Sequence, residues 1–368
     1  MPPAVGGKAA LPSIEGMRAI VYSAKGPSSV LCLAERPVPE PGTGQVRVRM
    51  VRSGVNPTDW KARAGASSAS SFAEVTPGQD GAGVIDALGD GVAGLAVGYR
   101  VWLYLGQHGT PYGTAAEYGV LEWHRAVPLP DSLPDDVSAF DLGASLGVPA
   151  VTAHRVLTSG APTSGPLTAG LGPAALAGQS VLVQGGAGAV GNAAIQLAVW
   201  SGATVITTVS SDEKAALATA AGAHHVVNYR TQDAASAIRK LAPDGVDLIA
   251  EVAPAVNNEL DVAVARNGAT IAIYANNGGD MFTVTVRQTF ALNLRYQFLL
   301  LYTLDPAHLA AAARDVTAAV AAGALRVGAQ AGLPLHHYPL EATQAAHDAV
   351  ERGAVGKVLI DIADGGGR

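Results

Sequence analysis

Residues Val181–Gly191, with the sequence VLVQGGAGAVG, are the segment around which this chain is organised. Its first three residues are apolar and predict a buried parallel strand, and Gly185, Gly188 and Gly191 then follow with the spacing G-x-x-G-x-x-G. The next nine residues predict a helix, and residues 204–209 predict a second apolar strand. A strand, a glycine turn, a helix and a strand in about 30 residues form the context that a dinucleotide-binding turn requires. The opposing interpretation is an ordinary glycine-rich turn in an α/β protein.

A dinucleotide needs this pattern because its diphosphate must come very close to the backbone. The diphosphate lies against N–H groups at the N-terminus of the helix, where the helix dipole favours anions and where a Cβ atom would hold the ligand away. We therefore expect the turn and the first residues of the helix to contact the cofactor. The residues predicted to do so are Gly185, Ala187, Gly188, Ala189, Val190 and Gly191.

Length and composition exclude several classes of protein. With 368 residues, the chain exceeds the size at which a single core keeps growing, so we expect two domains. It is 49% hydrophobic and 15% charged, which predicts a folded protein. Its apolar runs are far shorter than the ~18 residues that span a bilayer, so we expect no membrane segment. The net charge of −6 argues against a general nucleic-acid surface.

Residues 1–16 are small and polar and lack the apolar core of a secretory signal. We expect them to form a flexible extension, and we expect the protein to be cytoplasmic. The only cysteine, Cys32, falls in an apolar strand predicted over residues 30–33, which favours a buried core thiol over a nucleophile.

Two different patterns of secondary structure follow each other along the chain. Short strands joined by Gly and Pro turns predict a small β-rich barrel from residue 17 to about residue 135. Residues 134–146 and 150–157 predict two helices. Beyond the glycine turn, strands alternate with helices, which predicts a doubly wound parallel sheet in an α/β fold. The last strand, residues 356–362, is expected to return to the barrel.

The order of these elements resembles the medium-chain dehydrogenase/reductase superfamily, and most closely its zinc-independent branch of quinone oxidoreductases, including the zeta-crystallins. The resemblance implies a Rossmann domain over residues 149–302 and a GroES-like β-barrel domain, with the catalytic and substrate functions, from residues 17–148 and 303–368. Its motifs keep their order over nearly the whole chain: residues 54–57 (GVNP), 76–83 (TPGQDGAG), 97–101 (VGYRV), 147–153 (GVPAVTA), 222–229 (GAHHVVNY) and 338–341 (YPLE).

The sequence departs from the zinc alcohol dehydrogenases of that superfamily at two places. Those enzymes carry Gly-His-Glu where this chain has Gly78-Gln79-Asp80, and they bind zinc through a cysteine near the position of residues 54–59, where this chain has none. Catalytic zinc needs imidazole and thiolate ligands of this kind. The adjacent pairs His224–His225 and His336–His337 cannot easily chelate one ion from a strand. We therefore expect no metal.

The choice of cofactor depends on the end of the second strand. NAD-selecting sites place Asp or Glu there, whereas this chain has Ser210 and Ser211, with Lys214 just beyond. Hydroxyls and a cation suit the 2′-phosphate of NADPH. The resemblance adds Tyr229 to these three residues as the NADPH-selecting pocket. The alternative is that Ser211 only caps the next helix and that Lys214 lies on a solvated face.

The resemblance also implies positions for the chemistry. It places Asn56, Asp59 and Trp60 near the nicotinamide as the catalytic residues, although turn formation and helix capping also explain Asn56 and Asp59. The family often has a tyrosine near the position of Trp60, whose indole cannot donate a phenolic proton and is expected to be a stacking wall. Thr152 matches a position that contacts the nicotinamide carboxamide, and Lys357 is expected to reach the cofactor phosphates.

Two further pocket candidates, Tyr104 and Tyr112, rest only on their positions in loops, and a core or surface role explains them equally well. The superfamily generally forms dimers through the edges of its cofactor-domain sheets. The alternating residues 282–287 are expected to be such an edge. The apolar residues 290–302 are expected to be buried at that seam or over the active site.

The resulting hypothesis is an NADPH-dependent, zinc-independent oxidoreductase that transfers hydride to a quinone or to an α,β-unsaturated carbonyl, with a homodimer as its assembly. Residues 56–61 (NPTDWK) also resemble the trans-acting enoyl reductases of polyketide synthesis, so an enoyl-thioester reductase is an alternative. A third alternative, from a different class, is a non-catalytic NADPH-binding protein like the lens crystallins.

Overall fold

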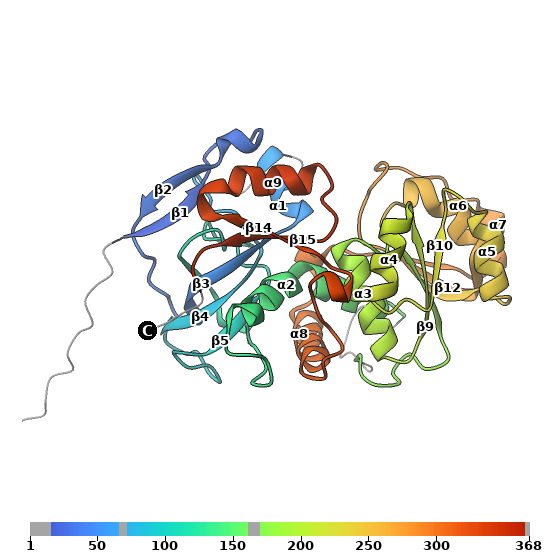
Figure 1. The fold of residues 1–368 in the computed structure, drawn as a ribbon, viewed down its shortest axis with the longest axis horizontal. Helices are drawn as coiled ribbons and strands as arrows, with labels where there is room; N and C mark the ends of the chain where they lie inside the picture. Colours follow the sequence, from blue (N-terminus) through green and yellow to red (C-terminus); the bar gives the residue numbers. More distant parts are fainter. Residues whose placement is uncertain (1–15, 66–71, 161–169, 365–368) are drawn as a thin grey trace, which may run out of the picture.

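The computed structural model describes residues 16–65, 72–160 and 170–364. Nearly all of the predicted N-terminal extension therefore lies outside the described residues. Two large sheets make up most of the described molecule, beside a small two-stranded one. The two large sheets lie side by side along the long axis, with the helix α2 (Val137–Leu157) reaching from one towards the other (Figure 1). The domain boundaries at residues 148/149 and 302/303 stay a prediction.

The parallel sheet has six strands in the order β10-β9-β8-β11-β12-β13, and each neighbouring pair is parallel. The chain adds β9 and β10 on one side of β8, and then β11 to β13 on the other side. The carboxyl ends of β8 and β11 therefore form a topological switch point, which is where doubly wound sheets bind ligands. The predicted doubly wound sheet is thus confirmed. Its strands are β8 (Ser180–Gln184), β9 (Thr204–Val209), β10 (His225–Asn228), β11 (Val246–Glu251), β12 (Ala265–Ile273) and β13 (Arg295–Phe298). The helices that accompany them are α3 (Ala189–Trp200), α4 (Asp212–Ala220), α5 (Ala234–Leu241), α6 (Pro254–Val264) and α7 (Val286–Ala291).

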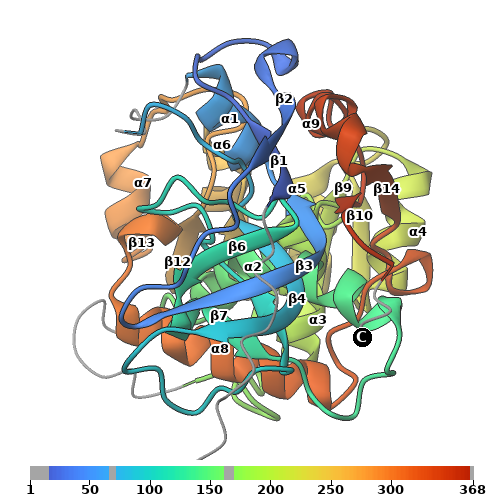
Figure 2. The ribbon, with the colours of Figure 1, turned by 90° about the vertical axis from the view of Figure 1, so that its left-hand side faces the viewer.

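The barrel sheet has the order β14-β15-β3-β4-β5-β7, and β6 pairs with β3. The closing strand β15 pairs antiparallel with β3, as expected, and this pairing sets Val358 opposite Val55. Viewed from this end, the barrel strands lie in front of α2 and α3 (Figure 2). The strands of this part are β1 (Met17–Val21), β2 (Cys32–Arg36), β3 (Gln45–Val55), β4 (Asp80–Leu88), β5 (Arg100–Leu103), β6 (Tyr118–Glu122), β7 (Ala126–Pro128), β14 (Leu335–Pro339) and β15 (Lys357–Asp361). Its helices are α1 (Pro57–Ala64) and α9 (Thr343–Glu351).

The helix α2 joins the two sheets, and a break at Gly147 divides it into two parts, in agreement with the two helices predicted over residues 134–146 and 150–157. Gly147 has non-helical angles (φ −13°, ψ −111°) in the middle of an otherwise continuous helix. The carboxylate of Asp80 enters this break and accepts the N–H of Val148 at 2.7 Å. A Cβ on Gly147 would lie 2.0 Å from the Oδ1 atom of Asp80, so the break needs glycine. The helix α8 (Pro306–Ala321) packs against α2.

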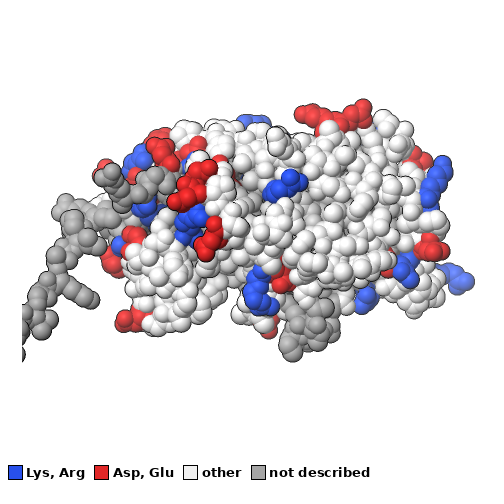
Figure 3. Space-filling view, turned by 60° about the horizontal axis from the view of Figure 1, so that its bottom comes forward, with Lys and Arg blue, Asp and Glu red and all other residues white. Residues whose placement is uncertain are grey.

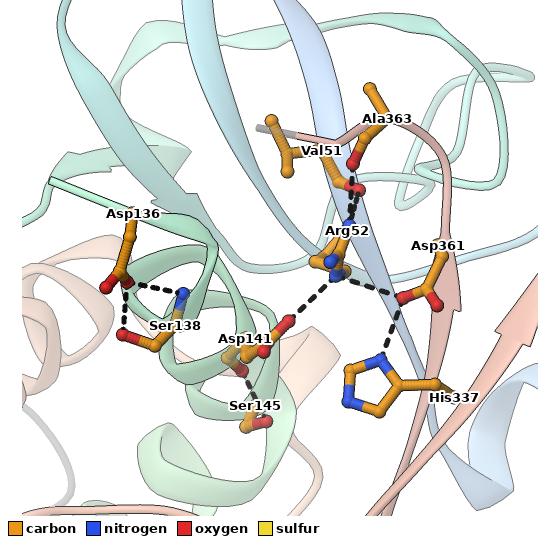
Figure 4. A network of polar contacts seen from close by, with 9 residues as sticks. All are labelled: Val51, Arg52, Asp136, Ser138, Asp141, Ser145, His337, Asp361 and Ala363. Carbon is orange, nitrogen blue, oxygen red and sulfur yellow. Dashed lines mark hydrogen bonds and ion pairs between the residues drawn. The ribbon is translucent and has the colours of Figure 1, made fainter. Parts of the chain in front are cut away.

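A network around Arg52 fixes the first half of α2 to the barrel (Figure 4). The Nε atom of this arginine lies 2.7 Å from Asp141 of α2 and 3.0 Å from Asp361 at the end of β15. Its Nη1 atom donates to the carbonyls of Val51, at 3.0 Å, and Ala363, at 2.7 Å. The Arg52 side chain is only 9% exposed, so these partners offset the cost of burying its charge.

Two expectations were wrong. Cys32 is exposed, because it begins β2, the outer strand of the two-stranded β1–β2 sheet, whose side chains are mostly uncovered. Residues 282–285 form no strand, and Val286 already begins α7. The edge of the parallel sheet is β13, which occupies the position beside β12.

The surface carries no broad basic area among the described residues that Figure 3 draws: blue and red side chains are interspersed, and much of that face is white. Among the described residues, every helix is too short or too polar to cross a membrane.

Candidate active site

A cleft of about 520 Å³ lies where the glycine turn, α1 and α2 meet. Its lining therefore comes from both halves of the molecule, and it opens at the switch point of the parallel sheet. From the barrel side it is lined by Asn56, Pro57, Thr58 and Lys61, and from α2 by Val148, Pro149, Thr152 and Arg155. The sheet side supplies Gly185, Gly188–Gly191, Val252, Tyr274–Asn277, Leu299–Tyr302 and Leu304.

The glycine turn uses each of its glycines for a different physical reason. Gly185 has a φ of +74°, which a side chain would strain. A Cβ on Gly191 would lie 2.5 Å from the carbonyl oxygen of Gly185, so the turn and the helix can pack only with glycine there. A Cβ on Gly188 would meet nothing closer than 3.5 Å. The protein itself therefore leaves room for a side chain at Gly188, and the missing atom enlarges the cleft at the N-terminus of α3.

The predicted 2′-phosphate pocket forms a small cluster at the end of β9. The side chain of Ser211 caps α4, as expected, by accepting the N–H of Lys214 at 3.3 Å. The ammonium of Lys214 in turn donates to the hydroxyl of Ser210 at 3.1 Å. The N–H of Tyr229 bonds to the carbonyl of Val209, and its side chain is half exposed. The carboxylate of Asp212, the residue after Ser211, accepts a hydrogen bond from the amide of Asn228 at 3.2 Å.

The N-terminus of α1 holds a buried polar network behind the cleft. Asn56 caps the helix, and its own N–H donates to Asp59 Oδ2 at 2.7 Å. The amide of Asn56 donates to Asp80 Oδ2 at 2.7 Å and accepts from Lys357 Nζ at 2.7 Å. Lys357 and Asp80 are 2.9 Å apart and form an ion pair. The contacts among Asn56, Asp80 and Lys357 hold Asn56 at the cleft wall. They also engage the ammonium of Lys357, which does not line the cleft.

The carboxyl group of Asp59 is buried beside that network. Burial, and then the negative charge of Asp80, raises its pKa to about 7, against the opposing effects of the N–H of Asn56 and the charge of Lys357. Asp59 does not line the cleft, and neither does Trp60, whose ring lies 5.9 Å from the Nζ atom of Lys61. The predicted catalytic residues Asp59 and Trp60 therefore stand outside the described lining of the cleft.

The structure brings together seven of the predicted site residues around the cleft: Asn56, Thr152, Gly185, Gly188, Ala189, Val190 and Gly191. Ala187 is buried beneath the turn. Tyr104 is a core residue that donates to the carbonyl of His124, and Tyr112 is exposed outside the cleft.

Sequence reasoning missed the hydroxyl pair of the cleft. Tyr302 donates to the hydroxyl of Thr58 at 2.9 Å, which ties the segment after β13 to α1 across the cleft. Burial, and then the charge of Asp59, raises the pKa of Tyr302, so its phenol keeps its proton. The apolar run 290–302 was a partial signal, since Leu299–Tyr302 do lie over the cleft, whereas Phe290 and Phe298 are 61% exposed.

Comparisons with known proteins agree with this architecture. A family model described as alcohol dehydrogenase GroES-like domain matches residues 42–131, and one described as zinc-binding dehydrogenase matches residues 189–326. Human quinone oxidoreductase is 30% identical over 350 residues, which are 94% of this chain and 97% of that protein. A 2-haloacrylate reductase from a Burkholderia species is 33% identical over 237 residues, 63% of this chain and 65% of that one.

A mycobacterial protein solved in complex with NADPH superimposes with a TM-score of 0.76 at 26% identity, over 94% of this chain and all of the other. The fold, the glycine turn at the switch point and the match over nearly the full length all indicate the same family. The chain therefore belongs to the medium-chain dehydrogenase/reductase superfamily, in its quinone oxidoreductase branch, and is an oxidoreductase of that family.

Proposed function

We propose that the protein is an NADPH-dependent, zinc-independent reductase that delivers hydride to a quinone or to an α,β-unsaturated carbonyl. The observation that carries this proposal is the cleft itself, which the glycine turn and the N-terminus of α1 line from opposite sides. A dinucleotide on the turn would thereby face polar groups that can bind the oxygen of an acceptor. The human relative is named a quinone oxidoreductase, and the mycobacterial neighbour was solved with NADPH, which together support the same reaction class and cofactor.

The residues present fit NADPH. The open space at Gly188 and the N–H groups that begin α3 suit a diphosphate. Ser210, Ser211 and Lys214 offer two hydroxyls and one cation to a 2′-phosphate, and Tyr229 lies beside them. Thr152 lies in the cleft, where a nicotinamide carboxamide would reach it. When bound, the cofactor supplies a hydride.

The chain's own groups would stabilise the charge that develops on the acceptor oxygen. The hydroxyl of Thr58 accepts a hydrogen bond from Tyr302, so its own proton is free to point into the cleft. Such a donor stabilises an enolate or quinol oxygen as it forms. Leu299 and Leu301 give the cleft an apolar wall that limits the access of water.

The proposal that the enzyme needs no zinc rests on the side chains found at the positions of the zinc ligands. Gln79 and Asp80 replace the histidine and glutamate of the zinc enzymes, and Asp80 is already paired with Lys357. The described residues contain no group of three or more His, Cys, Asp or Glu side chains that could hold a metal ion. A polarising group for the acceptor would therefore come from hydrogen-bond donors.

We also propose a homodimer that forms along β13, and a cytoplasmic location. Support for the dimer comes from this edge strand and its exposed apolar side chains: Phe298, its last residue, is 61% exposed, and Leu300, two residues later, is 57% exposed. An exposed edge with apolar side chains favours pairing with another chain.

The test is steady-state oxidation of NADPH and of NADH with a panel of quinones, an enone and a crotonyl thioester. We expect turnover of a quinone or the enone and a clear preference for NADPH. Turnover of the thioester alone would favour the enoyl-thioester alternative, and equal catalytic efficiency with NADH would contradict the cofactor assignment. Tight binding of NADPH without turnover of any acceptor would favour the non-catalytic alternative.

A further inference from the structure

Two carboxyl groups are buried together behind the glycine turn, and the proposed reaction uses neither of them. Glu251 ends β11 and Asp261 lies on α6, and both residues are 0% exposed. Among the described residues, neither carboxyl group makes an ion pair. Two carboxylates without a cation are costly to bury, so another group must neutralise this pair.

Each carboxyl group has hydrogen-bond donors on one oxygen and none on the other. Glu251 Oε1 accepts the N–H of Ala253 and, at 3.1 Å, the amide of Asn257. Asp261 Oδ1 accepts the amide of Gln184 at 2.8 Å. The other two oxygens, Glu251 Oε2 and Asp261 Oδ2, are buried without any hydrogen-bond partner. The two side chains are within hydrogen-bonding reach of each other, so a single proton between these two oxygens would satisfy both.

The surroundings of the pair place this proton on Asp261. Glu251 has two donors besides Asp261, which favour its ionised form, whereas Asp261 has one. Burial, and then the charge of Glu251, raises the pKa of Asp261 well above its ordinary value. Two phenols also face the pair, Tyr274 after β12 and Tyr296 on β13, and burial raises the pKa of both. Both phenols are neutral when protonated, so neither supplies the missing positive charge.

Hydrogen bonds connect Asp261 to the glycine turn. Gln184, which donates to Asp261, ends β8 and directly precedes Gly185. The amide oxygen of Gln184 accepts the hydroxyl of Thr208 at 2.5 Å, and that hydroxyl oxygen accepts the N–H of Gly185 at 3.4 Å. The bonds on both sides of the Gln184 amide therefore hold the residue from which the turn starts.

Glu251 reaches the same turn by a second route. The N–H that it accepts belongs to Ala253, so the carboxylate holds the short segment that contains Val252. Val252 lines the cleft, and its side chain lies 3.4 Å from the position of a Cβ on Gly185. The two carboxyl groups thus support both the start of the glycine turn and the cleft wall beside it.

We propose that Asp261 is held as a neutral carboxylic acid that donates its proton to Glu251, and that the pair positions the glycine turn and Val252 for NADPH. The proposal rests on the proposed function, because it needs the dinucleotide at this turn. Asp261 does not line the cleft, so it acts through Gln184 and Glu251 and is a positioning residue. Loss of its proton would set two negative charges against each other behind the turn and would leave Glu251 Oε2 without a donor.

The experiment compares two substitutions of Asp261 with a matched control. Asp261→Asn keeps the shape and, like the neutral acid, accepts from Gln184 with one end and donates to Glu251 with the other. Asp261→Ala removes both bonds, and Asp261→Ser replaces it if the alanine variant does not fold. The control is Asp247→Ala, because Asp247 also joins β11 to β8, but at the opposite end of the strands, where it accepts the N–H of Ser180 at 2.8 Å.

Three quantities are measured: the Kd for NADPH, the free energy of unfolding, and the infrared difference spectrum of wild type minus Asp261→Asn at neutral pH. We expect that spectrum to show the carbonyl band of a protonated carboxylic acid. The Kd of Asp261→Asn should stay within about threefold of the wild type, and that of Asp261→Ala should rise on the order of 10-fold, since two buried hydrogen bonds are lost. Asp247→Ala should lose stability and keep its Kd.

Other results would overturn the proposal. A spectrum without the acid band would show that Asp261 is ionised. A Kd of Asp261→Asn as weak as that of Asp261→Ala would show that a neutral donor at this position does not hold the turn. Loss of stability in Asp261→Ala with an unchanged Kd, as in Asp247→Ala, would leave the pair a structural role. These measurements need no turnover, so a protein that binds NADPH but reduces no acceptor contradicts the reductase proposal alone.

Discussion

The Nζ atom of Lys357 lies 2.9 Å from the Oδ2 atom of Asp80, a residue 277 positions earlier in the chain, and both side chains are almost completely buried. The pair ties the last strand of the barrel to the residue that enters the break in α2. Removing one member leaves the other charge buried without a partner, which typically costs 3–5 kcal/mol. We therefore expect Lys357→Met to lower the free energy of unfolding by about 3 kcal/mol or more.

Chemical denaturation measures this effect. The double variant Asp80→Asn/Lys357→Met removes both charges and should be more stable than Lys357→Met alone. A single variant whose unfolding free energy is within about 1 kcal/mol of the wild type would contradict the structural role of the pair.

The raised pKa of Asp59 predicts a pH dependence of stability. In the unfolded chain the group loses its proton near its ordinary pKa, 3.8, whereas the folded protein holds it up to about pH 7. Between these values the folded state binds more protons, so this group makes the protein less stable as pH rises. Asp59→Asn removes the effect, and its stability relative to the wild type should be higher at about pH 8 than at about pH 5 by a few kcal/mol.

Denaturation at the two pH values, with both proteins in the same buffers, tests the Asp59 prediction. Subtracting the wild-type curve cancels the other titrating groups. A difference between variant and wild type that does not change with pH would show that the carboxyl group titrates near its ordinary pKa.

The open space at Gly188 predicts that a side chain there would weaken NADPH binding without lowering the stability of the protein. Gly188→Ala adds a Cβ that meets no protein atom within 3.5 Å, so thermal stability should be nearly unchanged. The same atom would occupy space for the diphosphate, so we expect the Kd for NADPH to rise on the order of 10-fold. Fluorescence titration and a thermal melt measure the two quantities.

The matched control for Gly188→Ala is Gly191→Ala. Its Cβ would lie 2.5 Å from the carbonyl of Gly185, so this variant should lose stability as well as affinity. Normal NADPH binding by a folded Gly188→Ala protein would argue against the placement of the diphosphate at this turn.

The bond from Tyr302 to Thr58 predicts a catalytic role for the pair. Tyr302→Phe removes the hydroxyl that orients Thr58, and we expect kcat with the best acceptor to fall by about 10-fold or more. Tyr112→Phe, outside the cleft, is the control. If kcat of Tyr302→Phe stays within about twofold of the wild type, the hydroxyl pair does not assist the reaction.

The dimer proposal predicts that one added charge at the sheet edge separates the subunits. Phe298→Lys places a cation on β13, where an edge charge opposes strand pairing. We expect this variant to sediment as a monomer at micromolar concentration and the wild type to sediment as a dimer. Leu241→Lys, at the exposed end of α5, is the control and should remain dimeric. A monomeric wild type would contradict the proposal.

Local sequence patterns were sufficient to predict the order of the elements and the position of the glycine turn. Apolar runs and glycine spacing report local constraints, such as the positive φ of Gly185 and the close packing at Gly191, and these constraints act within a few residues. The same local logic identified Ser211 as the cap of α4.

The roles of the charged and hydroxyl groups depend on contacts between residues far apart in the chain. The pairing of β15 with β3 brings Lys357 to Asp80 and Asn56, so an ammonium expected at the cofactor phosphates instead closes a buried ion pair. Tyr302 meets Thr58 from 244 positions away, and Arg155 becomes part of the cleft because α2 continues beyond its break at Gly147. Local patterns carry no information about such contacts, because long-range packing sets both the burial and the partners of each side chain.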